Sequence, residues 1–192
     1  SKRRDYVRGF GYQGGASRGR GLQIAEDTIG TEFKNALIVP SENWGIGIMG
    51  FGEVLPYHEN KISLNKNVKD KWGLPVLDMD VEIKDNEKKM RLDMMNDAKE
   101  MLEAAGVKNV KTYDGGYEFG MGIHEMGTAR MGRDPKTSVL NGNNQVWDAP
   151  NVFVTDGACM TSASCVNPSL TYMALTARAA DFAVSELKKG NL

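Results

Sequence analysis

"NVFVTDGACMTSASCVNPSL", residues 151–170, joins a short apolar run to the start of a long amphipathic pattern. The apolar start predicts a buried central strand that ends at Asp156-Gly157. After a loop of small residues, Asn167 and Pro168 predict a helix start, because Asn is a favoured N-cap and Pro is favoured at the first helical position. The stretch therefore predicts strand, loop and helix, as in the last piece of an α/β layer.

Two amphipathic patterns predict the long helices of the chain. The later one ends at Lys188-Lys189-Gly190 and the earlier one runs from Asp85 or Asn86 to Gly106. The apolar side chains of the later helix predict one dry face, formed by Leu170, Met173, Ala174, Ala177, Ala180, Val184 and Leu187. Those of the earlier helix predict core filling by Met90, Met94, Ala98, Met101, Leu102 and Ala105.

Three stretches before the earlier helix predict strands: "WGIGIMGFGEVL" (44–55), "NKISLN" (60–65) and "LPVLDMDVEI" (74–83). The last alternates apolar and acidic side chains, which is typical of an antiparallel sheet with one solvated face. Residues 120–150 show little periodicity and predict a long loop region, a kind of segment that is often functional. The predicted fold class is α+β, with an antiparallel sheet and helices on one of its faces.

Composition excludes several classes of protein. The 192 residues carry 25 acidic and 24 basic side chains, a balance that points to neither nucleic acid nor an anionic membrane as a partner. No apolar run is long enough to span a bilayer. The compartment stays open, because the chain begins at Ser1 without a methionine and predicts a fragment whose export signal could lie upstream. Two cysteines, Cys159 and Cys165, and two histidines argue against a disulfide scaffold or a metal site.

"GFGYQG", residues 9–14, matches the dinucleotide pattern G-x-G-x-x-G letter for letter. That pattern binds a pyrophosphate only after a buried strand and at the start of a helix. The preceding residues are highly charged, and the following residues 15–21 are too rich in glycine for a helix. We therefore interpret it as a glycine-rich strand end that runs into a loop, and the hypothesis of an NAD-binding protein fails on context.

Taken singly, the candidate catalytic residues have ordinary explanations. His124 in a glycine-rich loop could be a surface histidine, and position 128 is not the second histidine of a zinc protease motif. Ser162, Ser164 and Cys165 could be nucleophiles, but no G-x-S-x-G elbow surrounds them. Asn167 is fully explained as a helix cap.

Taken together, three stretches are specific: "GIHEMGTARMG" (122–132), "FVTDGAC" (153–159) and "SCVNPSLTYMAL" (164–175). In this order they resemble the C-terminal part of the glucose–methanol–choline (GMC) family of flavoprotein oxidoreductases. The upstream stretch 52–83 is similar to the paired strands of that family's substrate domain. The family loop H-x-x-G-T-x-x-M-G is matched here by His124, Gly127, Thr128, Met131 and Gly132.

The resemblance implies an enzyme that oxidises an alcohol by passing a hydride to N5 of FAD while a base takes the hydroxyl proton. His124 would be that base, a task suited to imidazole. Asn167 corresponds to its partner, and because an amide does not titrate we assign it to orienting the substrate oxygen and bonding near the flavin. Glu125 and Arg130 either touch substrate or form a local ion pair that steadies the loop.

The predicted helix start also suits a flavin on physical grounds. A helix N-terminus presents unsatisfied N–H groups and a positive dipole end, which stabilise negative charge on a reduced flavin. Pro168 has no N–H, so we expect the N–H groups of Ser169 or Leu170 to make these contacts. Asp156 and Gly157, at the carboxyl end of the predicted strand, would contact the ribityl or phosphate region of FAD.

The domain organisation follows from the resemblance. Residues 1–137 would belong to the substrate-binding domain, and residues 138–192 would be the C-terminal return segment of a FAD-binding domain whose N-terminal half is missing here. The substrate would be a small alcohol, with sugars and polyols favoured, and the fragment alone would be inactive. The alternative from another class of protein is an isolated sugar-recognition domain without redox activity.

Overall fold

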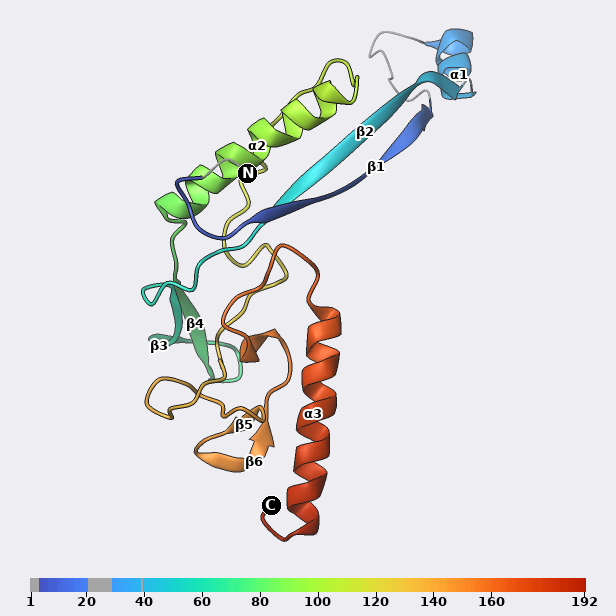
Figure 1. Ribbon diagram of the computed structural model, residues 1–192. Helices are drawn as coiled ribbons and strands as arrows, with labels where there is room; N and C mark the ends of the chain where they lie inside the picture. The colour runs from blue at the N-terminus through green and yellow to red at the C-terminus, as the bar shows by residue number, and fades with distance from the viewer. Residues whose placement is uncertain (1–3, 21–28, 39) are drawn as a thin grey trace. The chain divides into compact units, whose positions relative to one another are not determined.

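The computed structural model describes residues 4–20, 29–38 and 40–192. The described residues between 11 and 51 form one compact unit, and the remaining described residues form a second. The elements of the two units are described in turn, and Figure 1 labels them.

The smaller unit holds two long strands and a short helix. Strands β1 (Phe10–Arg20) and β2 (Pro40–Gly52) form a two-stranded sheet, and helix α1 (Gly30–Ile38) lies between them in sequence. A Cβ at Gly14 would collide with the carbonyl oxygen of Gly47, so glycine is needed for the close approach of these strands.

Residues 10–14 of the "GFGYQG" stretch are therefore strand, as predicted, and no helix begins directly after the pattern, because β1 continues to Arg20. The prediction of a loop at 15–21 is wrong for residues 15–20, because β1, which pairs with β2, continues to Arg20. Gly21 lies outside the described residues.

The second unit contains the predicted antiparallel strands. Strand β3 (Lys61–Lys69) pairs with β4 (Pro75–Asp80), with Ile62 opposite Met79 and Leu64 opposite Leu77. Alternation therefore gathers apolar side chains on one face of the pair, as predicted. That face is not dry in the described chain, because Leu64 and Leu77 are largely exposed.

Helix α2 (Asp85–Ala104) confirms the earlier amphipathic pattern. Gly106 ends it with φ +85°, the left-handed conformation in which glycine is favoured. The N-cap is Lys84 rather than Asp85 or Asn86, and Asn86 instead exchanges hydrogen bonds with the backbone of Val7. Met90 is fully buried, whereas the predicted core residue Met101 is exposed.

The C-terminal third begins with a small hairpin. Strands β5 (Gln145–Val146) and β6 (Ala149–Phe153) pair antiparallel, and Leu140, which is fully buried, bridges to Val146 and to Met131. The predicted strand exists, but the expectation that it is buried and central is wrong for the described chain. Because β6 pairs with β5 alone, Val152 is 43% exposed.

Helix α3 (Ser169–Lys188) runs beside this hairpin, with Phe182 edge-on to Phe153 at 6.3 Å between ring centroids. The face that packs differs from the predicted dry face. Its most buried member is Ala179, while Leu170 and Met173 are 80% and 68% exposed. α3 is apolar on two faces, and the described chain covers one of them.

The architecture is α+β with small antiparallel sheets and few helices, which confirms the predicted fold class at that level. The assignment of 138–192 to a flavin domain stays a prediction. Within the described ranges, no helix combines the length and apolarity that crossing a bilayer requires.

Candidate active site

The first two motif stretches are joined by backbone hydrogen bonds. The N–H groups of Ala129 and Met131 donate to the carbonyls of Ala158 and Cys159, at 3.0 and 2.9 Å. Ala158 and Cys159 belong to the 3-10 helix η1 (Gly157–Cys159), which follows β6. The histidine-bearing loop and the Asp-Gly turn therefore pack as one substructure.

Helix α3 joins the same substructure through its first and third turns. The Tyr172 hydroxyl lies 3.7 Å from the sulfur of Met126, two residues after His124. Arg178 lies 3.7 Å from the sulfur of Met131 and donates to the side chain of Asn144 at 3.1 Å. All three motif stretches are thus in mutual contact, although they are separated in sequence.

His124 is half-buried in a loop with unusual backbone geometry. Gly120 and Gly127 have φ +86° and +92°, and Ile123 has φ +56°, which is costly for a β-branched residue. A Cβ at Gly127 would lie 3.3 Å from the Thr161 carbonyl oxygen, so this glycine allows the loop to approach the segment that leads to Asn167. The turn that carries the imidazole is set by these three positions.

The predicted helix start is displaced by one residue. Pro168 is the N-cap of α3, Ser169 is its first residue, and no side chain caps the N-terminus. Asn167 is exposed and does not cap the helix, whereas Pro168 is buried. The first hydrogen bond of the helix runs from the Tyr172 N–H to the Pro168 carbonyl, at 3.1 Å. The N–H groups of Ser169 and Leu170 therefore have no acceptor within the helix.

Asp156 and Gly157 have local roles of their own. The exposed Asp156 carboxylate accepts the Ala158 N–H at 3.0 Å and so caps η1. A Cβ at Gly157 would lie 2.6 Å from the Met126 sulfur, so glycine is required where the histidine-bearing loop packs on η1. Contacts of these residues with a cofactor stay a prediction.

The ion pair considered for Glu125 and Arg130 is absent from the described part of the chain. Glu125 accepts the Gly122 N–H at 3.0 Å, and Arg130 donates to the Thr137 carbonyl at 2.8 Å. Both side chains thus fix the loop through backbone groups. His58 is exposed in its turn, as expected.

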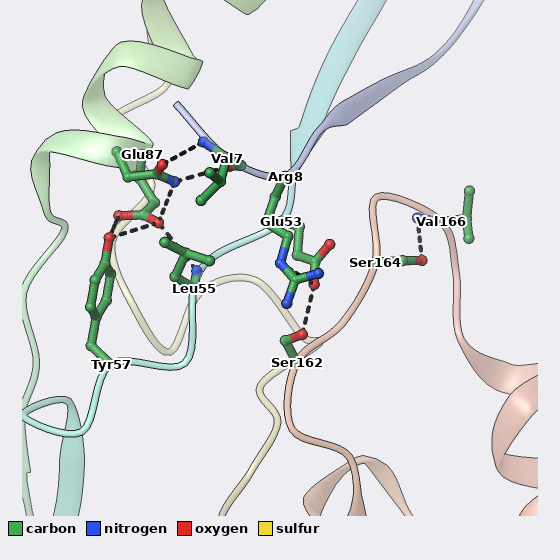
Figure 2. Close-up of polar contacts among 10 residues, drawn as sticks. Val7, Arg8, Glu53, Leu55, Tyr57, Glu87, Ser162, Ser164 and Val166 are labelled. Atoms are coloured by element: carbon green, nitrogen blue, oxygen red, sulfur yellow. Dashed lines mark hydrogen bonds and ion pairs between the residues drawn. The ribbon is translucent and has the colours of Figure 1, made fainter. Parts of the chain in front are cut away.

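Two carboxylates were not identified by the sequence patterns. Glu87 is 4% exposed and accepts from the Leu55 N–H and the Tyr57 hydroxyl. Glu53 accepts a 2.6 Å hydrogen bond from Ser162, in the loop that precedes Asn167 (Figure 2). A charged side chain at the end of a strand or helix is normally exposed to solvent. Composition and periodicity therefore could not distinguish Glu53 and Glu87 from the other acidic residues.

Asn144 is a further residue that pattern analysis did not single out. It is 0% exposed, has φ +63°, and donates to the Val154 carbonyl at 3.0 Å while accepting from Arg178. The turn-forming composition of "NGNN" (141–144) was its available signal, because Asn tolerates positive φ.

Two surface hollows of about 510 and 480 Å³ lie along α2. Their linings include neither His124 nor Asn167. Convergence of these two side chains on one cavity wall stays a prediction. Over the residues that the structure describes, no three histidine, cysteine or acidic side chains are grouped as a metal ion requires.

The two cysteines should differ in reactivity toward a thiol reagent. Burial raises the pKa of Cys159, which lowers its thiolate fraction, whereas Cys165 is partly exposed in the loop before α3. We expect Cys165 to react at least about tenfold faster at pH 8, since the thiolate is the reactive form. Labelling kinetics of Cys165→Ser and Cys159→Ser variants measure this, and equal rates would contradict it.

Comparison with known proteins identifies the family of the chain. A sequence profile described as GMC oxidoreductase matches residues 56–176, more than half of the chain. The chain therefore belongs to the GMC oxidoreductase family and corresponds to its C-terminal part, which confirms the resemblance.

Relatives in the family carry the names of dehydrogenases and oxidases. The chain is 35% identical to 2-methyl-1,2-propanediol dehydrogenase of Mycolicibacterium austroafricanum, over 93% of this chain and 33% of the relative. It is 30% identical to the fructose dehydrogenase large subunit of Gluconobacter japonicus, over 76% of this chain and 26% of the relative. It is 31% identical to the gluconate 2-dehydrogenase flavoprotein of Pantoea cypripedii, over 77% and 25%. The chain thus spans a third or less of the length of these relatives.

Proposed function

We propose that this chain supplies the substrate-side catalytic groups of a FAD-dependent enzyme that oxidises a CH–OH group of a sugar or polyol. The observation that carries the proposal is the mutual packing of the three motif stretches, which brings the loops of His124 and Asn167 into contact through Gly127 and Thr161. The relatives named for a diol, fructose and gluconate favour a small polyhydroxylated substrate.

His124 is the proposed base. The half-buried imidazole sits on a turn whose backbone is set by two glycines and Ile123, so its position is restricted before substrate binds. A neutral imidazole nitrogen can accept the hydroxyl proton of an alcohol within hydrogen-bond reach. Removing that proton lets the carbinol carbon release its hydrogen as hydride.

Asn167 is the proposed orienting group. Its side chain is exposed and is not used as a helix cap, so the amide is available to donate to the substrate oxygen. An amide keeps the same protonation state across the working pH range, which suits orientation and not proton transfer.

The N-terminus of α3 has features that fit a flavin. The uncapped N-terminus of α3, with the N–H groups of Ser169 and Leu170 unsatisfied within the helix, suits an electron-rich acceptor. Gly157 lies near the Tyr172 hydroxyl of α3, and Asp156 and Gly157 would face the ribityl or phosphate region. FAD, when bound, would accept the hydride at N5, and the gluconate relative is itself named a flavoprotein.

The exposed face of α3 supports a larger protein around this chain. Leu170, Met173, Val184 and Leu187 are exposed in the described chain, and contiguous apolar side chains of this kind normally mark a surface that another segment covers. We propose that the N-terminal, FAD-binding half of the same protein covers it, and that the isolated chain is inactive.

The alternative of a sugar-recognition module without redox activity is not favoured, because the relatives carry the names of oxidoreductases.

A flavin-bleaching screen on the full-length protein tests the proposed function. Anaerobic addition of sugars, polyols and simple alcohols should bleach the flavin absorbance with at least one polyhydroxylated compound. A full-length protein without bound flavin, or with flavin that none of these compounds reduces, would contradict the proposal.

A further inference from the structure

Glu53 connects two distant parts of the larger unit. It follows the end of β2, and its N–H donates to the Gly9 carbonyl at 3.1 Å. Its side chain is 15% exposed and accepts the Ser162 hydroxyl at 2.6 Å, across 109 residues of sequence. The Arg8 guanidinium lies 3.7 Å from the same carboxylate oxygen and balances its charge (Figure 2).

The segment that carries Glu53 is itself anchored. The buried Glu87 carboxylate, in the first turn of α2, accepts the Leu55 N–H at 3.1 Å and the Tyr57 hydroxyl at 3.0 Å (Figure 2). Burial, with the hydrogen bond to Glu87, raises the pKa of Tyr57 to about 12, so its hydroxyl remains a donor. Glu53 therefore projects from a fixed support.

Ser162 lies on a largely exposed loop. The loop 161–167 joins η1 to α3, and Ser164, Val166 and Asn167 are exposed. A second hydrogen bond in this loop, from the Val166 N–H to the Ser164 hydroxyl at 3.3 Å, is local (Figure 2). The hydrogen bond from Ser162 to Glu53, called the Glu53–Ser162 tie below, instead joins this loop to the segment that follows β2.

The Glu53–Ser162 tie also lies next to the point where the loop of His124 meets the loop of Asn167. The residue before Ser162 is Thr161, whose carbonyl oxygen faces Gly127 of the histidine-bearing loop. Asn167 follows five residues later on the same loop. Ser162 therefore lies between the point where the two loops meet and Asn167.

We propose that Glu53 is a positioning residue of the reaction site, which holds Ser162 and thereby places Asn167 against the substrate oxygen. This inference rests on the proposed function. Glu53 touches neither substrate nor cofactor in this role, and its effect passes through Ser162.

The test uses stopped-flow flavin reduction in the full-length flavoprotein, with a substrate from the bleaching screen. Glu53→Ala and Ser162→Ala should each lower the limiting reduction rate about tenfold or more, because small misplacements of reacting groups cost rate steeply. KM should change less than kcat. The double variant should be no slower than the slower single variant, because both remove the same contact. Glu53→Gln keeps the accepting oxygen and should stay within about threefold of wild type.

Two controls separate positioning from loss of structure. Ser164→Ala removes a hydroxyl from the same loop without breaking the tie, and should reduce flavin at close to the wild-type rate. Thiol labelling of Cys165, which lies in this loop, reports loop freedom without any turnover. It should accelerate in Glu53→Ala and Ser162→Ala and not in Glu53→Gln, while flavin content stays unchanged.

The outcomes distinguish the two proposals. If wild-type flavin is not reduced by any alcohol, the proposed function fails. If wild type is reduced and Glu53→Ala is as fast, or the losses in the double variant multiply, the positioning role of Glu53 is overturned. Unchanged Cys165 labelling in both alanine variants overturns it as well.

Discussion

A His124→Ala substitution should lower the limiting rate of flavin reduction by about 10²- to 10⁴-fold, the range that a positioned general base contributes. Alanine cannot accept the hydroxyl proton, so hydride release must occur from the neutral alcohol. Flavin content should stay near wild type, because none of the proposed cofactor contacts comes from His124. Anaerobic stopped-flow reduction under saturating substrate measures the effect.

The chain offers a matched control for this prediction. His58 is the other of its two histidines, and it lies exposed in the turn between β2 and β3. His58→Ala should change the reduction rate by less than about twofold, in line with other surface substitutions. Equal rates for wild type and His124→Ala would remove His124 from the role of base.

An Asn144→Ala substitution should lower the free energy of unfolding by about 2–4 kcal/mol. Asn144 is fully buried at φ +63°, where alanine is strained. The change also removes the side-chain donor to the Val154 carbonyl and the side-chain oxygen that accepts from Arg178. These contacts join the β5–β6 hairpin to α3, so the whole C-terminal substructure is affected. Urea denaturation of the full-length protein measures the loss.

Two further variants divide this loss into its causes. Asn144→Gly removes the hydrogen bonds but tolerates the positive φ, so it should recover the strain contribution and remain destabilised by the rest. Asn143→Ala changes the neighbouring asparagine, whose backbone N–H makes the local contact to Asn141, and should cost less than about 0.5 kcal/mol. An Asn144→Ala variant as stable as wild type would contradict the role of Asn144.

Local patterns predicted the elements well. Alternation located β3 and β4, and helical spacing located α2 and α3, because these patterns reflect the backbone geometry of each element. The motif resemblance placed the chain in its family. What sequence periodicity could not decide was which apolar face is covered, since α3 is apolar on two sides and the described chain packs against only one.

The polar contacts were beyond prediction from sequence. Glu87 and Glu53 look like ordinary surface acids, and their burial depends on partners brought close by tertiary structure. Asn167 was explained as a cap, yet α3 begins one residue later and leaves its side chain uncommitted. Boundary shifts of one residue are common, and here such a shift leaves Asn167 available for the orienting role proposed for it.

The span between Glu53 and Ser162 has a kinetic consequence for folding. The β3–β4 and β5–β6 hairpins close over short stretches of chain, and such local contacts form early. A contact across 109 residues must first overcome the entropy of closing a long loop. We therefore expect the described helices and hairpins to form before the contact between Glu53 and Ser162, so that a half-folded molecule has its local elements while the loop before α3 is not yet held.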